Sequence, residues 1–414
     1  MKKRKNITSL NISGNFATCA ICSIDDKGNI VIQGTASVPS RGVEGGAISD
    51  LSEVASVVSR AIEKSESMAH AKAFSLIASC DGSNIRSYNT RGNITIAEKE
   101  NEISRRDIER VTEAAKTIAL PFDREIIHSI IRDFILDGQD GVKDPSGMFG
   151  TRLEIDMEIV TGLITHLHNL RRAINTAGFE IQDIVLSGIA AAQTVLEELE
   201  KDLGVIFIYV SYSSTHIIVY NAGHIKSIEI LPIGSADLTE LISDKFKMPR
   251  EYAEDVLKRE ATLDKSSITE EDKIISKIGS MHRSIPRIAL YETIEPKAKE
   301  LTQKITDALK RMAFAKEAAA GCVVAGELAD LGGFLEMLEL ALNMPVKMGL
   351  VKDVFNTSGE MMRITNPGQI VCLGLIKYWA QEGAKRKIRK KGWWENTPIG
   401  RLIAKARDIF SDYF

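Results

Sequence analysis

Cysteines and long apolar runs are scarce in this chain of 414 residues. Their scarcity limits the cellular compartments in which we expect to find the protein. The five cysteines are an odd number without the spacing of a disulfide framework, which fits a reducing cytosol. No run of about 18 apolar residues occurs, so a transmembrane helix is not expected. The basic segment 1–6 is not followed by the apolar stretch of a signal peptide. We therefore expect a cytoplasmic protein.

Two pairs of potential metal ligands have the wrong spacing for a shared metal ion. Cys19 and Cys22 lie in a predicted strand, where residues i and i+3 point to opposite faces. His166 and His168 lie in a predicted helix, where residues i and i+2 do not face each other. Neither pair is expected to bind a metal, and a redox role for the cysteines is not expected either.

Charge is distributed unevenly between the body of the chain and its end. With 44% hydrophobic and 26% charged residues, the composition is ordinary for a globular protein, and the length allows two or more domains. The net charge is −3, but residues 385–414 alone contain nine Lys/Arg and three Asp/Glu, which leaves −9 for the remainder. An acidic body with a basic end favours an anionic membrane over nucleic acid as the partner.

The basic end has the pattern of a membrane-surface helix. Six of the seven residues 385–391 are basic, and Trp393 and Trp394 follow. Thr397 can cap a helix whose first position is Pro398. Its apolar side chains recur on one face: Ile399, Leu402, Ile403, Ala406, Ile409, Phe410, Tyr413 and Phe414. At roughly 25 Å the helix is too short to span a bilayer, and it suits the headgroup layer with the tryptophans at interface depth.

Two other roles for this end stay open at the level of sequence. The helix can dock on the protein's own core, as most terminal helices do, and the basic run can bind nucleic acid. A docking helix needs neither the basic run nor the paired tryptophans, so we favour peripheral membrane attachment through residues 385–414. Each basic residue would add roughly 1 kcal/mol near an anionic surface.

Two stretches of alternating apolar and polar residues open the two halves of the chain alike. Strands are predicted at 7–12, 16–24 and 29–36, and again at 204–210, 214–220 and 224–231. Short loops of small polar residues, 13–15 and 211–213, join the first two strands of each half. Apolar stripes predict helices at 49–65 and 161–177. This repeat indicates two related α/β domains that face each other across a cleft. In folds of this kind the first turn of each domain binds phosphate.

Ordered motifs along almost the whole chain resemble the FtsA family, the bacterial actin homologues of cell division. They include Pro39-Ser-Arg-Gly-Val-Glu-Gly-Gly46, Asp144-Pro-Ser-Gly-Met148, Gly150-Thr-Arg-Leu-Glu154, Leu231-Pro-Ile-Gly234, Pro345-Val-Lys-Met-Gly349 and Leu373-Gly-Leu375. The resemblance implies an α/β fold of the duplicated actin and ribonuclease-H type, with an FtsA-type inserted subdomain and a C-terminal amphipathic helix. The implied parts are subdomain 1A (1–80 and 161–190), 1C (81–160), 2A (191–233 and 306–384), 2B (234–305), and a basic linker with the membrane helix (385–414).

At the phosphate-binding turns the sequence departs from the pattern of the actin superfamily. That pattern has aspartates that hold Mg²⁺ and glycines that let the backbone approach phosphate. Here Asn11 and Tyr209 replace the two aspartates, and Tyr212 would put a ring where backbone should approach phosphate. Glu327 adds negative charge to the adenosine loop. We expect ATP binding to be weakened or lost, Mg²⁺ not to bind, and metal-assisted hydrolysis not to occur.

The resemblance assigns residues from several segments to what remains of a nucleotide site. They are Ser13, Gly14, Asn15, Ser213, Ser214, Thr215, Glu254, Lys258, Lys297, Glu300 and Gly326. Lys297 and Glu300 match the family's Arg-x-x-Glu beside adenine. Glu254 and Lys258 match its Ala-Glu-x-x-Lys helix near ribose and base. As i,i+3 and i,i+4 pairs, these four residues also fit ordinary solvated helix faces.

The resemblance implies a scaffold and not an enzyme. A cell-division adaptor of this family would lie on the inner face of the cytoplasmic membrane and polymerise side-on through subdomain 1C. It would bind the C-terminal peptide of the tubulin homologue FtsZ on subdomain 2B. Many weak membrane contacts along a polymer would add up to firm attachment. Alternatives are an actin-like adaptor of a type IV pilus or secretion platform, and an active ATPase or sugar kinase of the same fold.

Overall fold

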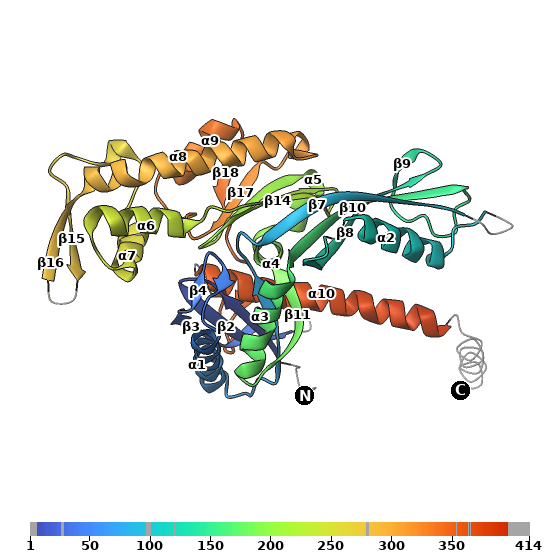
Figure 1. The fold of residues 1–414 in the computed structure, drawn as a ribbon, viewed down its shortest axis with the longest axis horizontal. Helices are drawn as coiled ribbons and strands as arrows, with labels where there is room; N and C mark the ends of the chain where they lie inside the picture. The colour runs from blue at the N-terminus through green and yellow to red at the C-terminus, as the bar shows by residue number, and fades with distance from the viewer. Residues whose placement is uncertain are drawn as a thin grey trace.

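The protein has two halves, each built on a mixed β-sheet (Figure 1). A computed structural model describes residues 6–25, 29–96, 101–119, 121–278, 281–352, 354–362, 364 and 366–395. The sheet of the first half has the strand order β11-β6-β1-β2-β3-β19. Its strands are β1 (Ile7–Ile12), β2 (Phe16–Ile24), β3 (Ile30–Pro39), β6 (Ser75–Cys80), β11 (Glu180–Leu186) and β19 (Val354–Phe355).

The sheet of the second half repeats this order as β14-β13-β12-β17-β18. Its strands are β12 (Val205–Val210), β13 (Thr215–Asn221), β14 (His224–Leu231), β17 (Cys322–Gly326) and β18 (Val346–Met348). In both sheets a three-stranded antiparallel meander continues into parallel strands on the side of its first strand. The predicted duplicated α/β architecture is therefore confirmed, and the six meander strands lie within a few residues of their predicted ends.

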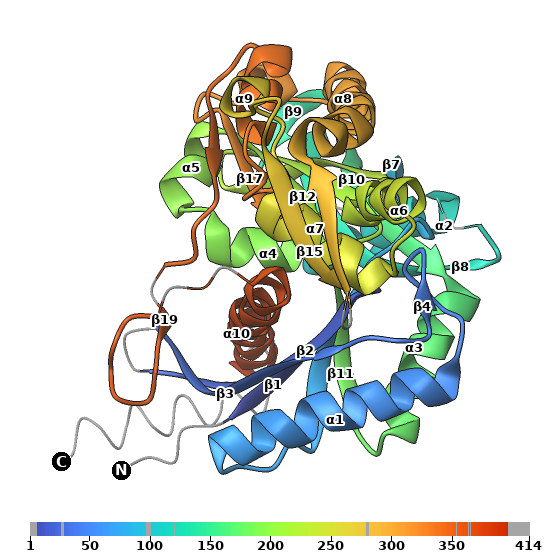
Figure 2. The same ribbon diagram turned by 90° about the vertical axis from the view of Figure 1, so that its left-hand side faces the viewer.

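Two helices cover one face of the first sheet, α1 (Leu51–Ala69) and α3 (Ile164–Thr176) (Figure 2). The carboxylate of Asp50 caps α1, because it accepts hydrogen bonds from the backbone N–H groups of Ser52 and Glu53. Helix α3 begins at Ile164, later than the sequence predicts, because strand β10 continues to Leu163. A short hairpin, β4 (Val43–Glu44) and β5 (Ala47–Ile48), precedes α1.

An inserted subdomain between β6 and α3 forms its own sheet, in the order β7-β10-β8-β9. Its elements are β7 (Ile85–Thr95), α2 (Arg105–Ala119), β8 (Arg124–Leu136), β9 (Gln139–Val142) and β10 (Arg152–Leu163). Leu153, Ile155 and Met157 of β10 belong to the apolar core that this sheet shares with α2. The alternate residues Asp156 and Glu158 point to the opposite face, which packs against β14 of the second half.

The outer part of the second half is mainly helical. It consists of α6 (Ser235–Phe246), α7 (Arg250–Glu260), the hairpin β15 (Lys273–Ile278) and β16 (Met281–Pro286), and α8 (Arg287–Arg311). Helices α5 (Glu198–Leu203) and α9 (Phe334–Leu342) and the short 3₁₀ turns 265–267 and 315–317 complete this half. One apolar core joins the outer part to the sheet, with Leu238, Ile294 and Val324 among its members.

Helices α4 (Ser187–Val195) and α10 (Pro367–Glu395) pack against each other near the junction of the two halves (Figure 2). They approach so closely that a side chain at Gly374 would collide with the backbone carbonyl of Ala190. Within the described residues, no helix is both long enough and apolar enough to cross a membrane.

Helix α10 continues through the basic run to Glu395, where the sequence predicts a separate linker. Lys and Arg are good helix formers, and Gly392 is the only strong helix-breaking residue between 385 and 395. The side chains of 382–395 and all of 396–414 lie outside the described residues. The predicted membrane contacts therefore stay predictions: Trp393, Trp394, Ile399, Leu402, Ile403, Ile409, Phe410 and Phe414.

Candidate functional site

The loops that join the first two strands of each half meet in the cleft. A Cβ atom added at Gly14 in the first loop would lie 2.5 Å from Cδ1 and Cε1 of Tyr212 in the second. The Tyr212 side chain is buried, and the guanidinium of Arg250 lies over its ring, 5.4 Å from the centroid. The ring therefore lies against the backbone of the first loop, where the family pattern requires space for phosphate.

Asn15 connects the first loop to two glutamates of the second half. Its Nδ2 donates hydrogen bonds to Oε1 of Glu254 on α7 at 2.8 Å and to Oε1 of Glu327 after β17 at 3.2 Å. Burial raises the pKa of both carboxyl groups, an effect that Asn15 and the ammonium of Lys258 only partly offset. A phosphate in this place would face two acidic groups.

The space that is left between the loops is small. Residues of both halves line it, among them Asn11, Ser13, Phe16, Tyr209 and Lys258. Its volume of about 20 Å³ accommodates about one water molecule, far less than a triphosphate requires. In this arrangement the protein's own side chains fill most of the space between the two loops.

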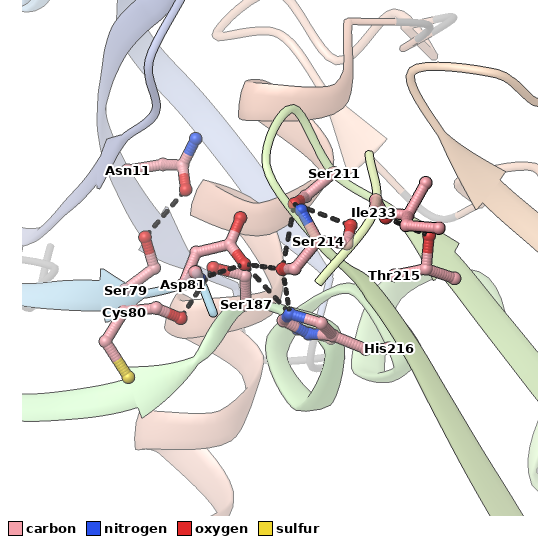
Figure 3. Close-up of polar contacts among 12 residues, drawn as sticks. Asn11, Ser79, Cys80, Asp81, Ser187, Ser211, Ser214, Thr215, His216 and Ile233 are labelled. Carbon is pink, nitrogen blue, oxygen red and sulfur yellow. Dashed lines mark hydrogen bonds and ion pairs between the residues drawn. The ribbon is translucent and has the colours of Figure 1, made fainter. Parts of the chain in front are cut away.

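A buried polar trio lies beside this space (Figure 3). Asp81 follows β6 in the first half, whereas Ser214 and His216 belong to the second half. Oδ1 of Asp81 accepts hydrogen bonds from Nε2 of His216, at 2.9 Å, and from the hydroxyl of Ser214. Nδ1 of His216 accepts a hydrogen bond from the backbone N–H of Gly188 at 3.0 Å. These bonds assign a neutral imidazole with its proton on Nε2.

The hydrogen bonds of the trio determine the direction in which the pKa of Asp81 shifts. Burial alone would raise the pKa of Asp81, but His216 and the hydroxyls of Ser211 and Ser214 hold it below its ordinary value. The trio cannot activate its serine as a hydrolase does. In such enzymes the carboxylate binds Nδ1 and leaves Nε2 for the serine, whereas here Asp81 and Ser214 share the same side of the ring.

The structure brings together about half of the predicted nucleotide-binding residues. Ser13, Asn15 and Lys258 line the small space, and Gly14 and Glu254 contact residues that line it.

Three of the others are engaged with the protein itself, and a fourth, Ser213, is only half-buried in the second loop. Ser214 binds Asp81, and Thr215 donates its hydroxyl to the carbonyl of Ile233 at 2.7 Å. Gly326 has φ +105°, and a side chain there would collide with the carbonyl of Val210, so the approach of β17 to β12 requires glycine.

Lys297 and Glu300 do not line this space. Both lie on α8, where Nζ of Lys297 pairs with Glu300 at 3.0 Å. The same ammonium lies 3.6 Å from Asp237 at the start of α6. These contacts are those of an ion pair on a helix face that also connects α8 to α6.

Asp81 and His216 were not identifiable as partners from the sequence. They are 135 residues apart, and neither belongs to a nucleotide-site motif. The sequence did contain one signal. Asp81 lies at the end of one apolar strand and His216 lies inside another, and titratable groups in such places are rarely buried unless they are paired.

A second group of buried polar residues lies inside the inserted subdomain, on the face of its sheet that packs against β14 of the second half. Arg132 on β8 lies 3.8 Å from Asp156 and 3.7 Å from Glu158, which are longer than hydrogen bonds. Among the described residues, Nε of Arg132 and Oδ1 of Asp156 have no hydrogen-bond partner. Burial raises the pKa of Glu158 to about 7 although Arg132 opposes the shift. A cavity of about 480 Å³ adjoins Arg132 and Glu158.

Two family models match successive parts of the chain. The SHS2 domain inserted in FTSA matches residues 82–161, which correspond to the inserted sheet and its helix. The model of cell division protein FtsA matches residues 212–374, which cover most of the second half and the start of α10.

Curated relatives extend the similarity to nearly the whole chain. The cell division protein FtsA of Pseudomonas aeruginosa is 30% identical over 408 residues, which are 97% of each chain. The FtsA protein of Bacillus subtilis is 31% identical over 374 residues, 89% of this chain and 82% of its own.

Solved structures agree on the fold. The PilM-PilN type IV pilus biogenesis complex has a TM-score of 0.66 at 14% identity and covers 90% of this chain and 98% of its own. MreB5 of Spiroplasma citri bound to ADP has a TM-score of 0.50 at 10% identity and covers 93% and 98%. The fold of this chain is therefore actin-like, with an inserted subdomain of the SHS2 type.

Proposed function

Because this chain belongs to the FtsA family of cell division proteins, we propose that it is an adaptor that attaches FtsZ filaments to the inner face of the cytoplasmic membrane. The observation that carries the proposal is a family likeness over 97% of the chain, combined with a basic and amphipathic end. An adaptor needs binding surfaces and no reaction chemistry. A cleft filled by its own side chains is compatible with that role.

The proposed membrane contact is the apolar face of residues 396–414 together with the basic run 385–391. The apolar face would be buried in the headgroup layer, and the basic run would be attracted to anionic lipid. We expect the full chain to sediment with vesicles that contain phosphatidylglycerol. A truncation after Ala384 should stay in the supernatant.

A matched pair of substitutions tests the two contributions separately. Phe410→Glu puts a charge in the centre of the apolar face and should abolish sedimentation at every salt concentration. Ser411→Glu makes the same change of charge on the polar side and should bind nearly as the wild type does. Replacing Lys390 and Lys391 by Ala should weaken binding, and added salt should imitate this effect, because exposed charges are screened beyond about 8–10 Å. If Phe410→Glu sediments normally, the helix packs on its own protein and the membrane proposal fails.

The proposed FtsZ contact is subdomain 2B, residues 234–305, which contains α6, α7, β15, β16 and most of α8. An acidic and apolar peptide of the type found at the C-terminus of FtsZ should bind the full chain in calorimetry. Removing an exposed apolar side chain such as Ile275 from the hairpin then tests whether this surface is used. Absence of binding at high micromolar peptide would contradict this part of the proposal.

We also propose that the protein polymerises side-on through the inserted subdomain 1C. Its apolar residues Phe122 and Phe149 are largely exposed, as contact residues between copies would be before assembly. Electron microscopy on anionic lipid monolayers should show filaments. Phe122→Ser and Phe149→Ser are the variants to compare with the wild type, and filaments unaffected by both would argue against this surface.

ATP hydrolysis is not part of the proposed function. Asn11 and Tyr209 stand where the family pattern has metal-binding aspartates, and two carboxyl groups face the phosphate position. A coupled assay of the purified protein should show no Mg²⁺-dependent hydrolysis above background, and ATP binding should be weak or absent. Hydrolysis that disappears in Glu254→Ala or Lys258→Ala would mean that the site is active.

A second candidate is an adaptor of a type IV pilus platform. The fold likeness to the PilM-PilN complex favours it, although the identity of 14% establishes only the fold. Adaptors of that kind are expected to reach the membrane through a partner and not through an amphipathic helix of their own. Failure of both vesicle binding and FtsZ-peptide binding would therefore favour this candidate.

A further inference from the structure

We propose that side chains of this protein, and not a bound nucleotide, hold its two halves together across the cleft. In a duplicated fold in which the first turn of each half binds phosphate, a bound nucleotide contacts both halves and so connects them. Here each turn contacts the opposite half directly, through three separate bridges. The proposal concerns the cleft alone and does not depend on the membrane or FtsZ contacts.

The first bridge is the buried hydrogen-bonded contact of Asp81 with His216 and Ser214 (Figure 3). The side chain of Asp81 is 9% exposed and that of His216 is 0% exposed. A carboxylate buried to this extent needs hydrogen-bond donors. Both side-chain donors to its Oδ1 come from the opposite half, so separation of the halves would break both bonds at once.

The orientation of His216 is itself held by the backbone. Nδ1 accepts the N–H of Gly188 at the start of α4, and a Cβ atom at Gly188 would lie 2.6 Å from that nitrogen. The close fit keeps the ring in the tautomer that donates from Nε2. Gly188 lies within the range 161–190 predicted for the first half, so this bond also crosses the cleft, and its amide reports on separation of the halves.

The second bridge is the amide of Asn15, which is shared by two carboxyl groups of the opposite half. The bond to Glu254 is 2.8 Å long and the bond to Glu327 is 3.2 Å long. Glu254 lies on α7 of the outer part, whereas Glu327 follows β17 of the sheet. One residue of the first loop thus connects to both parts of the second half.

The third bridge is the ring of Tyr212 on the backbone of Gly14. It fills the remaining space, so that about 20 Å³ is left between the loops. A nucleotide could reach the phosphate position only by displacing this ring and breaking the bonds of Asn15. The closed arrangement of the halves, and any assembly that requires it, is therefore independent of nucleotide.

Hydrogen exchange and small-angle scattering of the full-length protein test this directly. Without nucleotide, the amide of Gly188 should be strongly protected and the radius of gyration should match the closed structure. Adding Mg-ATP should change neither quantity. If Mg-ATP makes the protein more compact or increases protection at Gly188, nucleotide closes the cleft and the proposal is overturned.

Asp81→Ala tests the first bridge, with Asp107→Ala as its matched control. Asp107 is also buried and accepts hydrogen bonds from Ser104, but it acts within the inserted subdomain alone. Both variants should lower the melting temperature. Only Asp81→Ala should speed exchange at Gly188 and enlarge the radius of gyration. If neither variant opens the cleft, Asp81 merely supports its own half and the proposal fails.

Two milder variants keep the test decisive if Asp81→Ala does not fold. Asp81→Asn keeps the acceptor oxygen and should open the cleft less than Asn15→Ala, which removes the second bridge entirely. Equal exchange at Gly188 in wild type and Asn15→Ala would contradict the proposed role of Asn15. Vesicle sedimentation of all these variants should be normal, so failure of the bridges and failure of the membrane proposal remain distinguishable.

Discussion

Charged side chains are buried in two places of this protein, in the cleft between the halves and inside the inserted subdomain, and the two places differ in how well the polar contacts are made. In the cleft, Asp81 and His216 meet at 2.9 Å, with a serine hydroxyl completing the group. Inside the inserted subdomain, Arg132 of β8 stays 3.7–3.8 Å from the carboxylates of Asp156 and Glu158 on β10. Nε of that arginine has no hydrogen-bond partner among the described residues.

The difference shows that burial of a charged group does not by itself indicate a stabilising contact. In the cleft, short hydrogen bonds outweigh desolvation, so the pKa of Asp81 is below its ordinary value. Beside Arg132 the effect of desolvation exceeds that of the nearby guanidinium, so the pKa of Glu158 rises to about 7. The cleft contact is therefore suited to fix the two halves, whereas the group around Arg132 adds little to the stability of the inserted subdomain.

The largest expected effect is that of breaking the cleft contact. His216→Ala removes the Nε2 donor from the buried carboxylate of Asp81 and should lower the free energy of unfolding by about 3 kcal/mol. At pH 6 Arg132→Met, which removes the loosely paired guanidinium, should cost less than about 1.5 kcal/mol. Urea unfolding of both variants measures the comparison. A larger loss for Arg132→Met would reverse our ranking of the two contacts.

The second prediction concerns the pH dependence of the looser contact. The pKa of Glu158 is raised from 4.5 to about 7, so the folded protein binds a proton that the unfolded chain has already released. The free energy of unfolding should therefore fall as the pH rises from about 4.5 to about 7, by roughly 1–3 kcal/mol. Glu158→Gln should remove this fall, matching wild type at pH 5 and exceeding it at pH 8.

Glu154→Gln on the same strand is the control for that experiment. Its carboxylate pairs with Arg152 near the surface, at 3.1 Å, and the substitution should leave the pH profile of stability as it is in wild type. An unchanged profile in Glu158→Gln would show that other groups cause the fall.

The third prediction tests the packing of the two loops. Gly14→Ala would put a methyl group 2.5 Å from the ring of Tyr212 and should cost about 1–3 kcal/mol. In a Tyr212→Ala background the same change should cost less than about 0.5 kcal/mol, because the obstacle is gone. A double-mutant cycle by thermal unfolding measures the coupling. Additive effects would mean that the ring does not press on the first loop.

The smallest expected effect is that of Lys297. Its ion pairs with Glu300 and Asp237 are partly exposed, so Lys297→Ala should cost no more than about 1 kcal/mol. Differential scanning calorimetry should show a small shift in melting temperature. A loss above about 2 kcal/mol would indicate that Lys297 does more than connect α8 to α6.

The fold was largely predictable because its strands and helices carry local patterns. Period-two alternation identified the six meander strands, and an apolar stripe identified helix α1 to within a few residues of its ends. The inserted subdomain was expected only through the family resemblance. The helical course of 385–395 was missed, because a run of like charges suggests a linker although its residues are good helix formers.

The candidate site was predictable only in part. The positions of Asn15 and Tyr212 followed from the turns between predicted strands. Their partners did not, since Glu254 and Glu327 are 239 and 312 residues away from Asn15. Residues at such separations meet through the docking of whole domains, which leaves no periodic trace in the chain.

The sequence by itself determined the duplicated α/β pattern, the presence of Asn11 and Tyr209 where the family pattern has aspartates, and the amphipathic character of the end of the chain, because each depends on residue type and local spacing. Only the tertiary structure decided that Asp81 meets His216 and that Asn15 bridges two glutamates. These outcomes depend on distances between domains. Those distances are set by contacts such as that of Gly374 with α4, and no local preference encodes them.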